Sequence, residues 1–269
     1  MREAFFELAD VHFSYLGKFP ALCGLNIKIT QGEKVAIIGA NGTGKSTLFL
    51  MLDALIFPDK GAIKAFGRDL KEEMFNDEQF SRFFRSKVGF VFQNPDVQLF
   101  CPTVREDITF GPLQLGVSGE ETRKRLDKLT AELDIAHLLD RSPHQLSIGE
   151  KRKIAIASVL AVDPEVIILD EPTAGLDPLT TRHVIDIIMK ANLDGKTIIT
   201  ATHDLQIIEE ISDCVHVFDR NKRITRCGNA GEILADTVFL QDNNLVHIHK
   251  HHHGTKAHVH PHNHTDHHH

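Results

Sequence analysis

The chain has 269 residues, which is enough for one large domain or two small ones. Hydrophobic residues make up 42% and charged residues 25%, the balance of an ordinary globular protein. The formal net charge of -7 argues against bulk binding of nucleic acid, because phosphate backbones select basic surfaces.

The first half of the chain predicts strands followed by a helix. Apolar and polar residues alternate over residues 5–13, and residues 25–29 share this pattern, so we expect two strands there. The apolar residues 35–38 are typical of a strand buried on both faces. A glycine-rich turn follows this strand, and residues 45–55 predict a helix.

The second half alternates helices with buried strands. Residues 93–160 have a helical pattern with proline and glycine breaks, including the charged amphipathic stretch 120–133. Further elements are predicted at 166–169 (strand), 179–190 (helix), 197–201 (strand), 204–211 (helix), and 214–218 and 223–226 (strands). Strands that alternate with helices indicate an α/β fold with a mainly parallel sheet, covered on both faces.

The four cysteines, Cys23, Cys101, Cys214 and Cys227, are scattered along the sequence and form no Cys-x-x-Cys pair. This spacing predicts neither a disulfide framework nor a zinc site. We therefore expect reduced, buried thiols, as in a cytosolic protein.

Residues 39–46, Gly-Ala-Asn-Gly-Thr-Gly-Lys-Ser, match the phosphate-loop pattern G-x-x-x-x-G-K-[ST] and lie between a predicted strand and helix. The glycines let backbone N–H groups surround phosphates, and the helix N-terminus adds its positive dipole end. Lys45 would reach the β- and γ-phosphates, and the Ser46 hydroxyl would bind Mg²⁺. The residues predicted to hold the nucleotide here are Gly39, Asn41, Gly42, Gly44, Lys45, Ser46 and Thr47.

Residues 166–171, Val-Ile-Ile-Leu-Asp-Glu, predict a buried strand that ends in two carboxylates. Asp170 would hold Mg²⁺, directly or through water, and Glu171 would polarise the attacking water. An ordinary strand with a charged end explains this segment alone, but it does not explain the phosphate loop as well. The two segments together predict a P-loop NTPase.

Residues 146–150, Leu-Ser-Ile-Gly-Glu, resemble the signature motif of ABC ATPases and precede the second buried strand, as in that family. Gln93 is similar to the family's Q-loop glutamine, residues 174–177 to its D-loop, and His203 to its switch histidine. Tyr15 lies upstream, where the family places an aromatic ring that stacks on adenine. The resemblance covers roughly residues 3–235, with the motifs in the family's order.

This resemblance implies the ABC ATPase fold, in which a mainly parallel sheet core carries an N-terminal antiparallel β subdomain and an inserted helical subdomain. The helical subdomain is expected at about residues 94–160. The whole ATPase domain is expected at residues 1–236, which leaves residues 237–269 as a histidine-rich tail.

The resemblance also implies catalytic roles for Glu171, His203 and Gln93. Glu171 activates the water, His203 contacts the γ-phosphate, and Gln93 contacts Mg²⁺ together with Ser46 and Asp170. Two of these assignments have plain structural alternatives. His203 could only cap the helix that follows it, and Tyr15 could be only a packing aromatic.

The signature motif further implies a dimer. It opens a helix, so its N–H groups and dipole form an anion site. The resemblance implies that the signature of a second chain closes over the ATP held by the first, in a homodimer or a heterodimer with a related chain. The residues expected at this contact are Ser147, Gly149 and Glu150 of the signature and Asp177 of the D-loop. Ile148 departs from the family, which usually has glycine there.

Residues 89–100, with residues 103–107 and 110–112, resemble the ATPase subunits of energy-coupling-factor importers, which take up vitamins or cobalt and nickel ions. The resemblance implies that this segment contacts transmembrane subunits. Prolines that merely break a surface loop are the alternative explanation. The longest apolar or small run, residues 154–162, is far short of the roughly 20 residues that span a bilayer. We therefore expect a peripheral subunit on the cytoplasmic face of the cell membrane.

The C-terminal tail points to a substrate, because 12 of the 18 histidines lie at or after His247. Such a composition cannot bury a core, so we expect disorder there. Neutral imidazoles bind Ni²⁺ and Co²⁺, and also Cu²⁺ and Zn²⁺. The candidate ligands are His251, His252, His253, His260, His262 and His264. A purification tag is the alternative, but a tag is normally one uninterrupted run, and other residues break this tail repeatedly.

These features together predict the ATP-hydrolysing subunit of a nickel or cobalt importer, with the choice of metal resting on the family resemblance. One alternative is the ATPase of an importer for a vitamin or another solute. A second is a soluble ABC protein that acts on nucleic acid or ribosomes. Such proteins usually join two cassettes in one chain or insert long coiled coils, and neither feature is present in this sequence.

Overall fold

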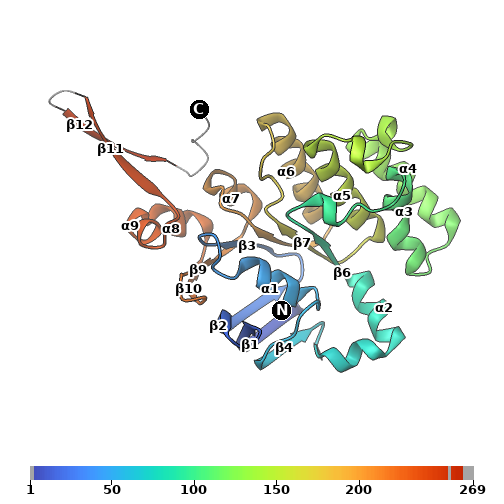
Figure 1. The fold of residues 1–269 in the computed structure, drawn as a ribbon, viewed down its shortest axis with the longest axis horizontal. Helices are drawn as coiled ribbons and strands as arrows, with labels where there is room; N and C mark the ends of the chain where they lie inside the picture. The colour runs from blue at the N-terminus through green and yellow to red at the C-terminus, as the bar shows by residue number, and fades with distance from the viewer. Residues whose placement is uncertain (1–2, 254–255, 263–269) are drawn as a thin grey trace.

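The computed structural model describes residues 3–253 and 256–262 (Figure 1). The strands are β1 (Ala4–Tyr15), β2 (Phe19–Thr30), β3 (Lys34–Ile38), β4 (Lys60–Ala65), β5 (Arg68–Asp69), β6 (Val88–Val91), β7 (Val166–Asp170), β8 (Thr197–Ala201), β9 (Cys214–Phe218), β10 (Ile224–Gly228), β11 (His247–His253) and β12 (Lys256–His262). The α-helices are α1 (Lys45–Leu52), α2 (Glu78–Lys87), α3 (Val104–Gln114), α4 (Gly119–Leu133), α5 (Ile148–Val162), α6 (Pro178–Leu193), α7 (Leu205–Ile211), α8 (Ala230–Ala235) and α9 (Thr237–Asp242). Single 3-10 turns lie at η1 (Glu72–Asn76), η2 (Pro95–Val97), η3 (Ala136–Leu138) and η4 (Pro143–Gln145).

Two large sheets carry the fold within these residues. The first has four antiparallel strands in the order β2-β1-β4-β5, and the second has six in the order β10-β9-β3-β8-β7-β6. In the second sheet, β9, β3, β8, β7 and β6 run parallel, and β10 is antiparallel to β9. The expected α/β core with a mainly parallel sheet and an antiparallel N-terminal subdomain is confirmed.

The central strands of the large sheet are buried on both faces because their apolar runs leave no polar side. In β3, Val35 and Ile37 belong to the core around α1, whereas Ala36 and Ile38 belong to the core under α7, α8 and α9. A parallel sheet needs such two-sided cover, since its helical crossovers lie on its faces. The carboxyl ends of these strands therefore meet at one edge, where loops to the following helices can form a site.

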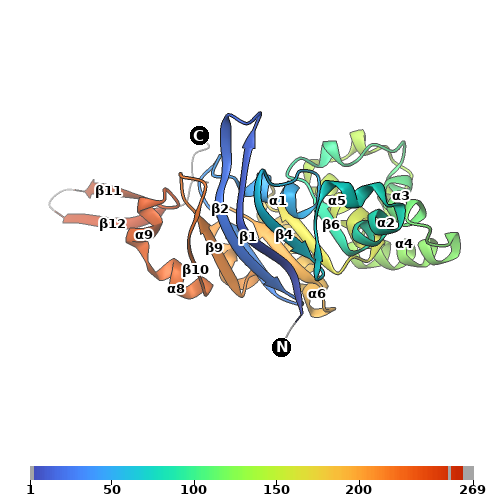
Figure 2. The same cartoon turned by 90° about the horizontal axis from the view of Figure 1, so that it is seen from below.

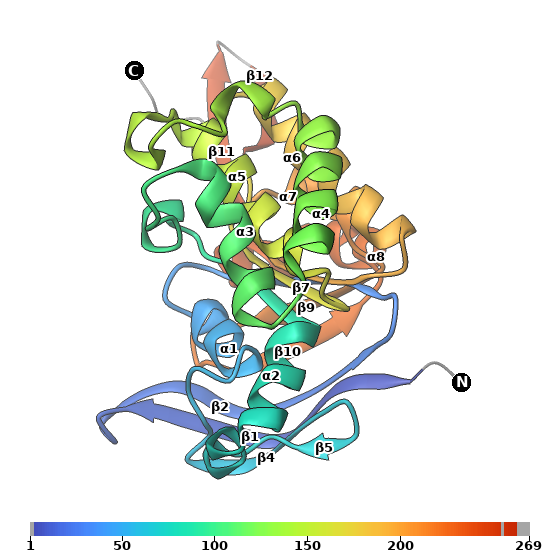
Figure 3. The ribbon, with the colours of Figure 1, turned by 90° about the vertical axis from the view of Figure 1, so that its right-hand side faces the viewer.

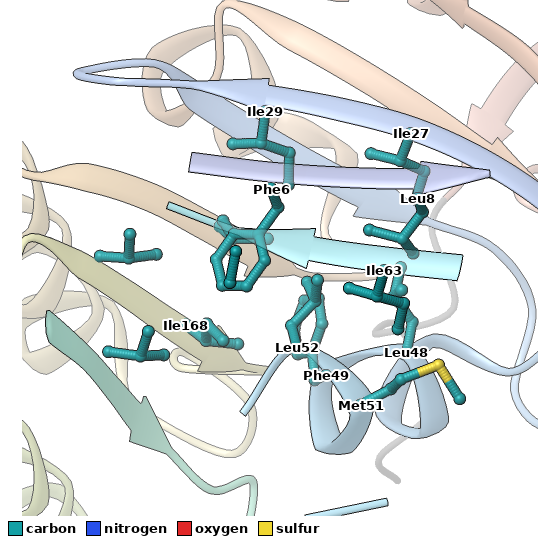
Figure 4. Packing of buried hydrophobic residues seen from close by; sticks show 14 of the residues in the cluster. Phe6, Leu8, Ile27, Ile29, Leu48, Phe49, Met51, Leu52, Ile63 and Ile168 are labelled. Atoms are coloured by element: carbon teal, nitrogen blue, oxygen red, sulfur yellow. The ribbon is translucent and has the colours of Figure 1, made fainter. Parts of the chain in front are cut away.

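Helix α1 lies between the two sheets (Figure 2). Leu48, Phe49 and Leu52 point from it into a cluster with Phe6 of β1 and Ile168 of β7, as Figure 4 shows. All five side chains are fully buried. This packing fixes the start of α1 relative to the ends of β3 and β7. The helix ends at Leu52, earlier than predicted, because Ala54 adopts a positive φ of 53° that helices do not allow.

The helices α3, α4 and α5 form a layer beside the large sheet (Figure 3). Their shared core includes Ile108, Leu126 and Ile154, and it continues onto β7 through Ile167 and Leu169. Helix α5 thus joins this layer to the sheet. No helix among the described residues is long and apolar enough to cross a membrane.

The folded domain extends beyond the boundary predicted at residue 236. Leu240 of α9 and the following Leu245 and Val246 are buried against β3, β9 and α8. The tail boundary therefore moves to Val246, because residues after 236 still complete an apolar core.

Beyond Val246, β11 and β12 pair as a hairpin that projects from the domain, as Figures 1 and 2 show. Disorder of the tail stays a prediction. The candidate ligands His251, His252, His253, His260 and His262 lie in these two strands, and His264 lies outside the described residues.

The expectation of buried cysteines is wrong. Cys23, Cys101 and Cys214 are partly accessible, and Cys227 is exposed. Cys23, Cys214 and Cys227 lie in strands and Cys101 in a loop, and the core does not cover any of them fully, which the sequence pattern around a single cysteine does not indicate.

The packing of α1 gives a stability prediction. Replacing Phe49, which is fully buried between the sheets, with alanine should lower the free energy of unfolding by about 3–5 kcal/mol. Val238→Ala is the matched control, because Val238 is 66% exposed. Urea denaturation of both variants measures the effect, and equal stability of the two would contradict the central position of α1.

Candidate nucleotide-binding site

The loop of residues 39–46 connects the end of β3 to the start of α1, and two of its glycines are required by close contacts. A Cβ on Gly44 would lie 2.3 Å from the carbonyl oxygen of Ala21, and Gly44 has a φ of 111°. A Cβ on Gly39 would lie 2.9 Å from the Cβ of Phe218. The backbone here therefore approaches its neighbours more closely than any side chain allows.

Helix α1 differs from the other α-helices of the described chain, because no side chain caps its N-terminus. Its N-cap position is Gly44, which has no side chain to accept a hydrogen bond. The first N–H groups of a helix lack partners within the helix, and they carry the positive end of its dipole. An anion such as a phosphate fits this position.

The Lys45 side chain is 94% buried by the loop around it, with 6% of its surface exposed. Its ammonium group donates hydrogen bonds to the carbonyl oxygens of Gly39, at 2.7 Å, and Ala40, at 3.2 Å. Burial lowers the pKa of Lys45, while the carboxylates of Glu171 and Asp170 oppose that change. Lys45 thus holds the loop closed around itself and presents a positive charge at the mouth of the loop.

Ser46 and Asp170 come together across the cleft, although they lie far apart in the sequence. Burial raises the pKa of Asp170 at the end of β7, and a hydrogen bond from Ser46 opposes this. A hydroxyl and a carboxylate next to Lys45 are oxygen ligands of the kind that Mg²⁺ takes beside phosphates. The donor set therefore fits a magnesium ion bound with a nucleotide.

Glu171 and His203 form a hydrogen-bonded pair at the ends of β7 and β8. The Glu171 Oε2 atom lies 2.7 Å from Nδ1 of His203, and Glu171 is 5% exposed. Its φ of 48° is unusual for a residue other than glycine, and its N–H donates to the carbonyl of Ala201 at 2.9 Å. The hydrogen bond with Glu171 raises the pKa of His203, and burial opposes it. His203 therefore makes a specific contact with the carboxylate, and the cap of α7 comes from Asp204 instead.

Lys45, Ser46, Asp170 and Glu171 line a cleft of about 550 Å³. Tyr15 and Phe19, at the facing ends of β1 and β2, form its apolar wall. The Tyr15 hydroxyl lies 3.2 Å from Oγ1 of Thr47, and its ring packs edge-on against Phe13 with centroids 5.0 Å apart. Tyr15 is still 42% exposed, so one face of its ring is open to a planar ligand. Asn41, Gly42, Gln93 and Asp170 complete the polar wall.

Arg152, which the sequence analysis missed, connects Gln93 to the signature helix. Arg152 is 2% exposed, and it donates to the carbonyl oxygens of Phe92, at 2.8 Å, and Gln93, at 2.7 Å. Its charge also acts on Asp170 and Glu171. A buried arginine costs free energy unless it is paired, so this contact fixes the position of the Gln93 loop relative to α5. In the sequence, Arg152 is one of four consecutive charged residues at the start of this helix, and nothing distinguishes it from the others.

Lys222 is a second residue that sequence reasoning missed. It lies in the turn between β9 and β10, and its ammonium group donates a hydrogen bond to the carbonyl oxygen of Gly42. Its own carbonyl accepts from the N–H of Cys23 at 3.0 Å. No sequence motif marks this position, because the contact depends on how the hairpin folds back onto the loop.

The signature residues lie outside the cleft. Among the described residues that line it, none comes from residues 146–150. Ser147 instead caps α5: its hydroxyl accepts from the N–H of Glu150 at 3.3 Å, and the Glu150 carboxylate accepts from the N–H of Ser147 at 2.7 Å. The hydrogen bonds that the N–H and the hydroxyl of Ser147 donate to the carboxylate lower the pKa of Glu150. Ile148 is 60% exposed, and a Cβ on Gly149 would lie 2.9 Å from Cγ2 of Thr180.

Asp177 also lies apart from the cleft and has a structural role within the chain. It caps α6 by accepting hydrogen bonds from the N–H of Thr180, at 3.0 Å, and from its hydroxyl, at 2.6 Å. Thr180 in turn approaches Gly149, so the D-loop and the signature are neighbours on one surface. The chain thus presents two separate features, a nucleotide cleft and an exposed signature surface.

Comparison with known proteins agrees with this geometry. Residues 22–174 match the ABC transporter family. The nickel import ATP-binding protein NikO of Rhodobacter capsulatus is 47% identical over 90% of this chain and 95% of its own length. The energy-coupling factor transporter ATP-binding protein EcfA of Methanothermobacter thermautotrophicus is 41% identical over 89% of this chain and 75% of its own.

Two solved structures have similar folds. CbiO1 of Clostridium perfringens, part of the ABC transporter complex CbiONQ, aligns with a TM-score of 0.77 and 36% identity over 90% of this chain and 95% of its own. The ATP-binding cassette MJ0796, in a dimeric post-hydrolysis state with ADP and Pi, aligns with a TM-score of 0.74 and 28% identity over 84% of this chain and 98% of its own. Similar cassettes therefore form dimers and belong to membrane transporter complexes.

The hydrogen bond between Glu171 and His203 predicts a change in titration. Glu171→Gln in the nucleotide-free protein should lower the pKa of His203, because the amide removes the charged acceptor that raises it. In the native chain this pair stabilises the fold below a pH of about 6.5, and the contribution is lost as pH rises through the raised pKa of His203. NMR titration of the His203 ring measures the shift.

The control for this titration is Asp204→Asn, since Asp204 is the weakest of the groups that act on His203 and asparagine keeps the cap of α7. A smaller shift in this control is expected. An unchanged His203 pKa in Glu171→Gln, or an equal shift in both variants, would contradict the contact.

The close approach of Gly44 to Ala21 predicts that two glycines of the same loop differ in tolerance. In Gly42→Ala, the new Cβ lies on a residue with a φ of 74° but has no atom within 4 Å. The substitution should therefore lower the free energy of unfolding by about 1 kcal/mol. Gly44→Ala adds a steric overlap at 2.3 Å and should cost more, with weaker nucleotide binding as well. Urea denaturation and nucleotide titration compare the two, and equal effects would rule out the predicted overlap.

Proposed function

The chain belongs to the ABC transporter family of ATP-binding subunits, and on that premise we propose that it powers an energy-coupling-factor importer of nickel or cobalt ions. Proteins of this family hydrolyse ATP to drive transport. The observation that carries the proposal is the cleft itself, which joins Lys45, Asp170 and Glu171 beside an uncapped helix N-terminus.

Each residue of the cleft has a role that its contacts support. The N–H groups at the start of α1 and the Lys45 ammonium group bind the β- and γ-phosphates of ATP. Ser46, Asp170 and Gln93 hold Mg²⁺, which supplies positive charge between these phosphates when bound. Tyr15 stacks on the adenine ring through its open face.

Glu171 accepts the hydrogen bond of the attacking water and orients it toward the γ-phosphate. Its burial and its fixed backbone hold the carboxylate at one position, and His203 keeps that carboxylate oriented. The unusual φ of Glu171 turns its side chain back toward the His203 ring. When γ-phosphate is bound, the other side of the imidazole is available to contact it.

The active unit we propose is a head-to-tail dimer. The exposed signature surface of one protomer closes over the nucleotide in the cleft of the other, so Ser147 and Gly149 contact the γ-phosphate from the opposite side. Glu150 sets the orientation of Ser147 through the cap of α5, and Asp177 fixes the neighbouring D-loop. Because the chain carries both halves of this site, a homodimer is sufficient, and a heterodimer with a related chain is the alternative.

A second surface is proposed to contact the membrane partner. Val97, Phe100, Phe110 and Leu113 are large apolar side chains that are 42–66% exposed, in the segment between β6 and α4. The rings of Phe100 and Phe110 pack edge-on with centroids 5.0 Å apart, so these two exposed side chains form one apolar patch. Such a patch fits a helix that a transmembrane subunit presents at the cytoplasmic face. Arg152 connects the same segment to the cleft, so nucleotide-driven movement can reach it.

Nickel or cobalt is the proposed cargo for two reasons. NikO, a close relative, is a nickel import protein, and the C-terminal segment of this chain is rich in imidazole ligands. We expect that segment to bind Ni²⁺ or Co²⁺. An importer for a vitamin or another solute is the alternative cargo assignment.

The role of Glu171 predicts the kinetics of one variant. Glu171→Gln should bind Mg-ATP normally but hydrolyse it about 10²–10⁴-fold more slowly, because the amide cannot accept a proton from the water. Glu72→Gln, an exposed position in η1, is the matched control and should keep native turnover. Phosphate release with equilibrium binding of ATP measures both quantities. Near-normal turnover in Glu171→Gln would remove Glu171 from the mechanism.

Metal uptake tests the cargo. Cells that carry the transmembrane partner and either the native chain or Glu171→Gln are given labelled Ni²⁺ and Co²⁺. Accumulation that depends on Glu171 supports the assignment and identifies the preferred ion. Equal accumulation in both cell lines would contradict the assignment to metal import, while the ATPase would remain and vitamins would become the cargo to test.

A further inference from the structure

Three potential metal ligands meet on β9 and β10, away from the nucleotide cleft. Side chains two residues apart on a strand point to the same face, so Cys214 and His216 of β9 lie together. The antiparallel register pairs His216 with Cys227 of β10. The three side chains therefore share one face at the β10 end of the large sheet, and Figure 2 shows the strands β9 and β10 next to β2.

The distances among these ligand atoms match a tetrahedral metal site. The two sulfur atoms lie 3.3 Å apart, and each lies 3.8 Å from Nε2 of His216. Around Zn²⁺ with ordinary bond lengths, a tetrahedral angle separates two sulfurs by about 3.8 Å and a sulfur from a nitrogen by about 3.6 Å. The existing arrangement needs shifts of only a few tenths of an ångström to surround an ion.

The partners of these groups also favour a ligand. His216 is 5% exposed, so its imidazole is held within the fold. The buried ring has Nε2 aimed at the two thiols, while Cys227 is exposed and leaves one side of the cluster open to solvent. The negative charge of Glu33 acts on both Cys214 and His216. A cation at this position gains attraction from that carboxylate.

We propose that Cys214, His216 and Cys227 bind a thiophilic divalent ion of the Zn²⁺ or Co²⁺ class, with water in the fourth position. Two thiolates and one imidazole form a soft ligand set that selects such ions over Mg²⁺ and Ca²⁺. Each thiol gives up its proton to solvent as the metal–sulfur bond forms, so the site gains two negative charges that the ion neutralises. The spacing of the cysteines gave no sign of this site, because the ligands come together only through the register of β9 and β10.

The position of the site links it to the nucleotide loop. The same two strands end in the turn that carries Lys222, whose ammonium group contacts Gly42. An ion bound to both strands therefore lies on the hairpin that contacts the phosphate loop, and it is distinct from the imidazoles of the C-terminal segment.

Titration of the full-length, reduced protein with Co²⁺ tests the proposal. Thiolate-to-Co²⁺ charge transfer gives near-ultraviolet absorption that imidazoles do not give, and residues 247–269 contain no cysteine, so the tail cannot produce it. We expect this absorption to saturate at one equivalent of thiolate-bound Co²⁺ per chain, and Zn²⁺ to abolish it by displacement. Cys214→Ser and Cys227→Ser should each lose the band or weaken binding by at least about tenfold.

Cys101→Ser is the matched control and should keep the absorption, because Cys101 lies in the loop before α3 and is not part of the β9–β10 cluster. ATP binding by each variant verifies that it is folded, and it separates failure of this site from failure of the nucleotide site. Absence of the thiolate band in the reduced native chain would overturn the proposal. So would a Cys214→Ser variant that gives the band with the affinity of the native chain, or a Cys214–Cys227 disulfide that survives reduction and leaves no thiol to bind the ion.

Discussion

The uncapped N-terminus of α1 is the constraint on which the site depends. A side chain closes the N-terminus of each other α-helix in the described chain, whereas Gly44 leaves the first N–H groups of α1 without a protein partner. Any side chain at position 44 would destabilise the loop, since the carbonyl oxygen of Ala21 occupies the space that its Cβ would need. The loop is therefore suited to bind an anion at these N–H groups. The packing of Phe49 between the two sheets then fixes this helix opposite Asp170 and Glu171.

The contrast with α5 explains why one chain does not complete the reaction site. Its N-terminus is satisfied by Ser147 and Glu150, and it faces away from the cleft of its own protomer. The N-termini of α1 and α5 both carry the positive end of a helix dipole. Within one protomer, however, only the N-terminus of α1 lies at the cleft. In the proposed head-to-tail dimer, a second chain supplies the missing end, so the γ-phosphate forms a contact between protomers. In the same proposal, hydrolysis removes that contact, and Arg152, which donates to the Gln93 carbonyl, links the change to the surface proposed for the membrane partner.

The sequence predicted the parts of the fold that depend on local pattern. The phosphate loop, the strand ending at Asp170 and Glu171, and the alternation of strands with helices follow from spacing and hydrophobic period, and the structure contains each of them. No element was assigned between residues 56 and 87, where β4, β5 and α2 form, because short strands and a phenylalanine-rich helix give no clear period. The end of the domain was placed too early, since the apolar contacts of Leu240 and Val246 are made with distant strands.

The remaining differences concern residues whose partners are far away in the sequence. Arg152 contacts carbonyl groups near residue 92, Lys222 contacts the phosphate loop, and Cys214 meets Cys227 only across two paired strands. Such contacts depend on strand register and helix packing, which no single segment specifies. The sequence motifs therefore identify the residues expected to bind and hydrolyse the nucleotide. The residues that hold them in place can be identified only from the tertiary fold.

The central claim is that ATP joins two copies of the chain through the signature surface. Sedimentation velocity of Glu171→Gln with and without Mg-ATP tests it most directly, with Ile148→Glu added to the same chain as a comparison. Ile148 is exposed on the signature surface and does not line the protomer's own cleft, so its substitution should leave ATP binding intact. We predict an ATP-dependent dimer for Glu171→Gln and a monomer when Ile148→Glu places a negative charge beside the phosphate. A protein that stays monomeric while saturated with ATP, or a dimer insensitive to Ile148→Glu, would contradict the account.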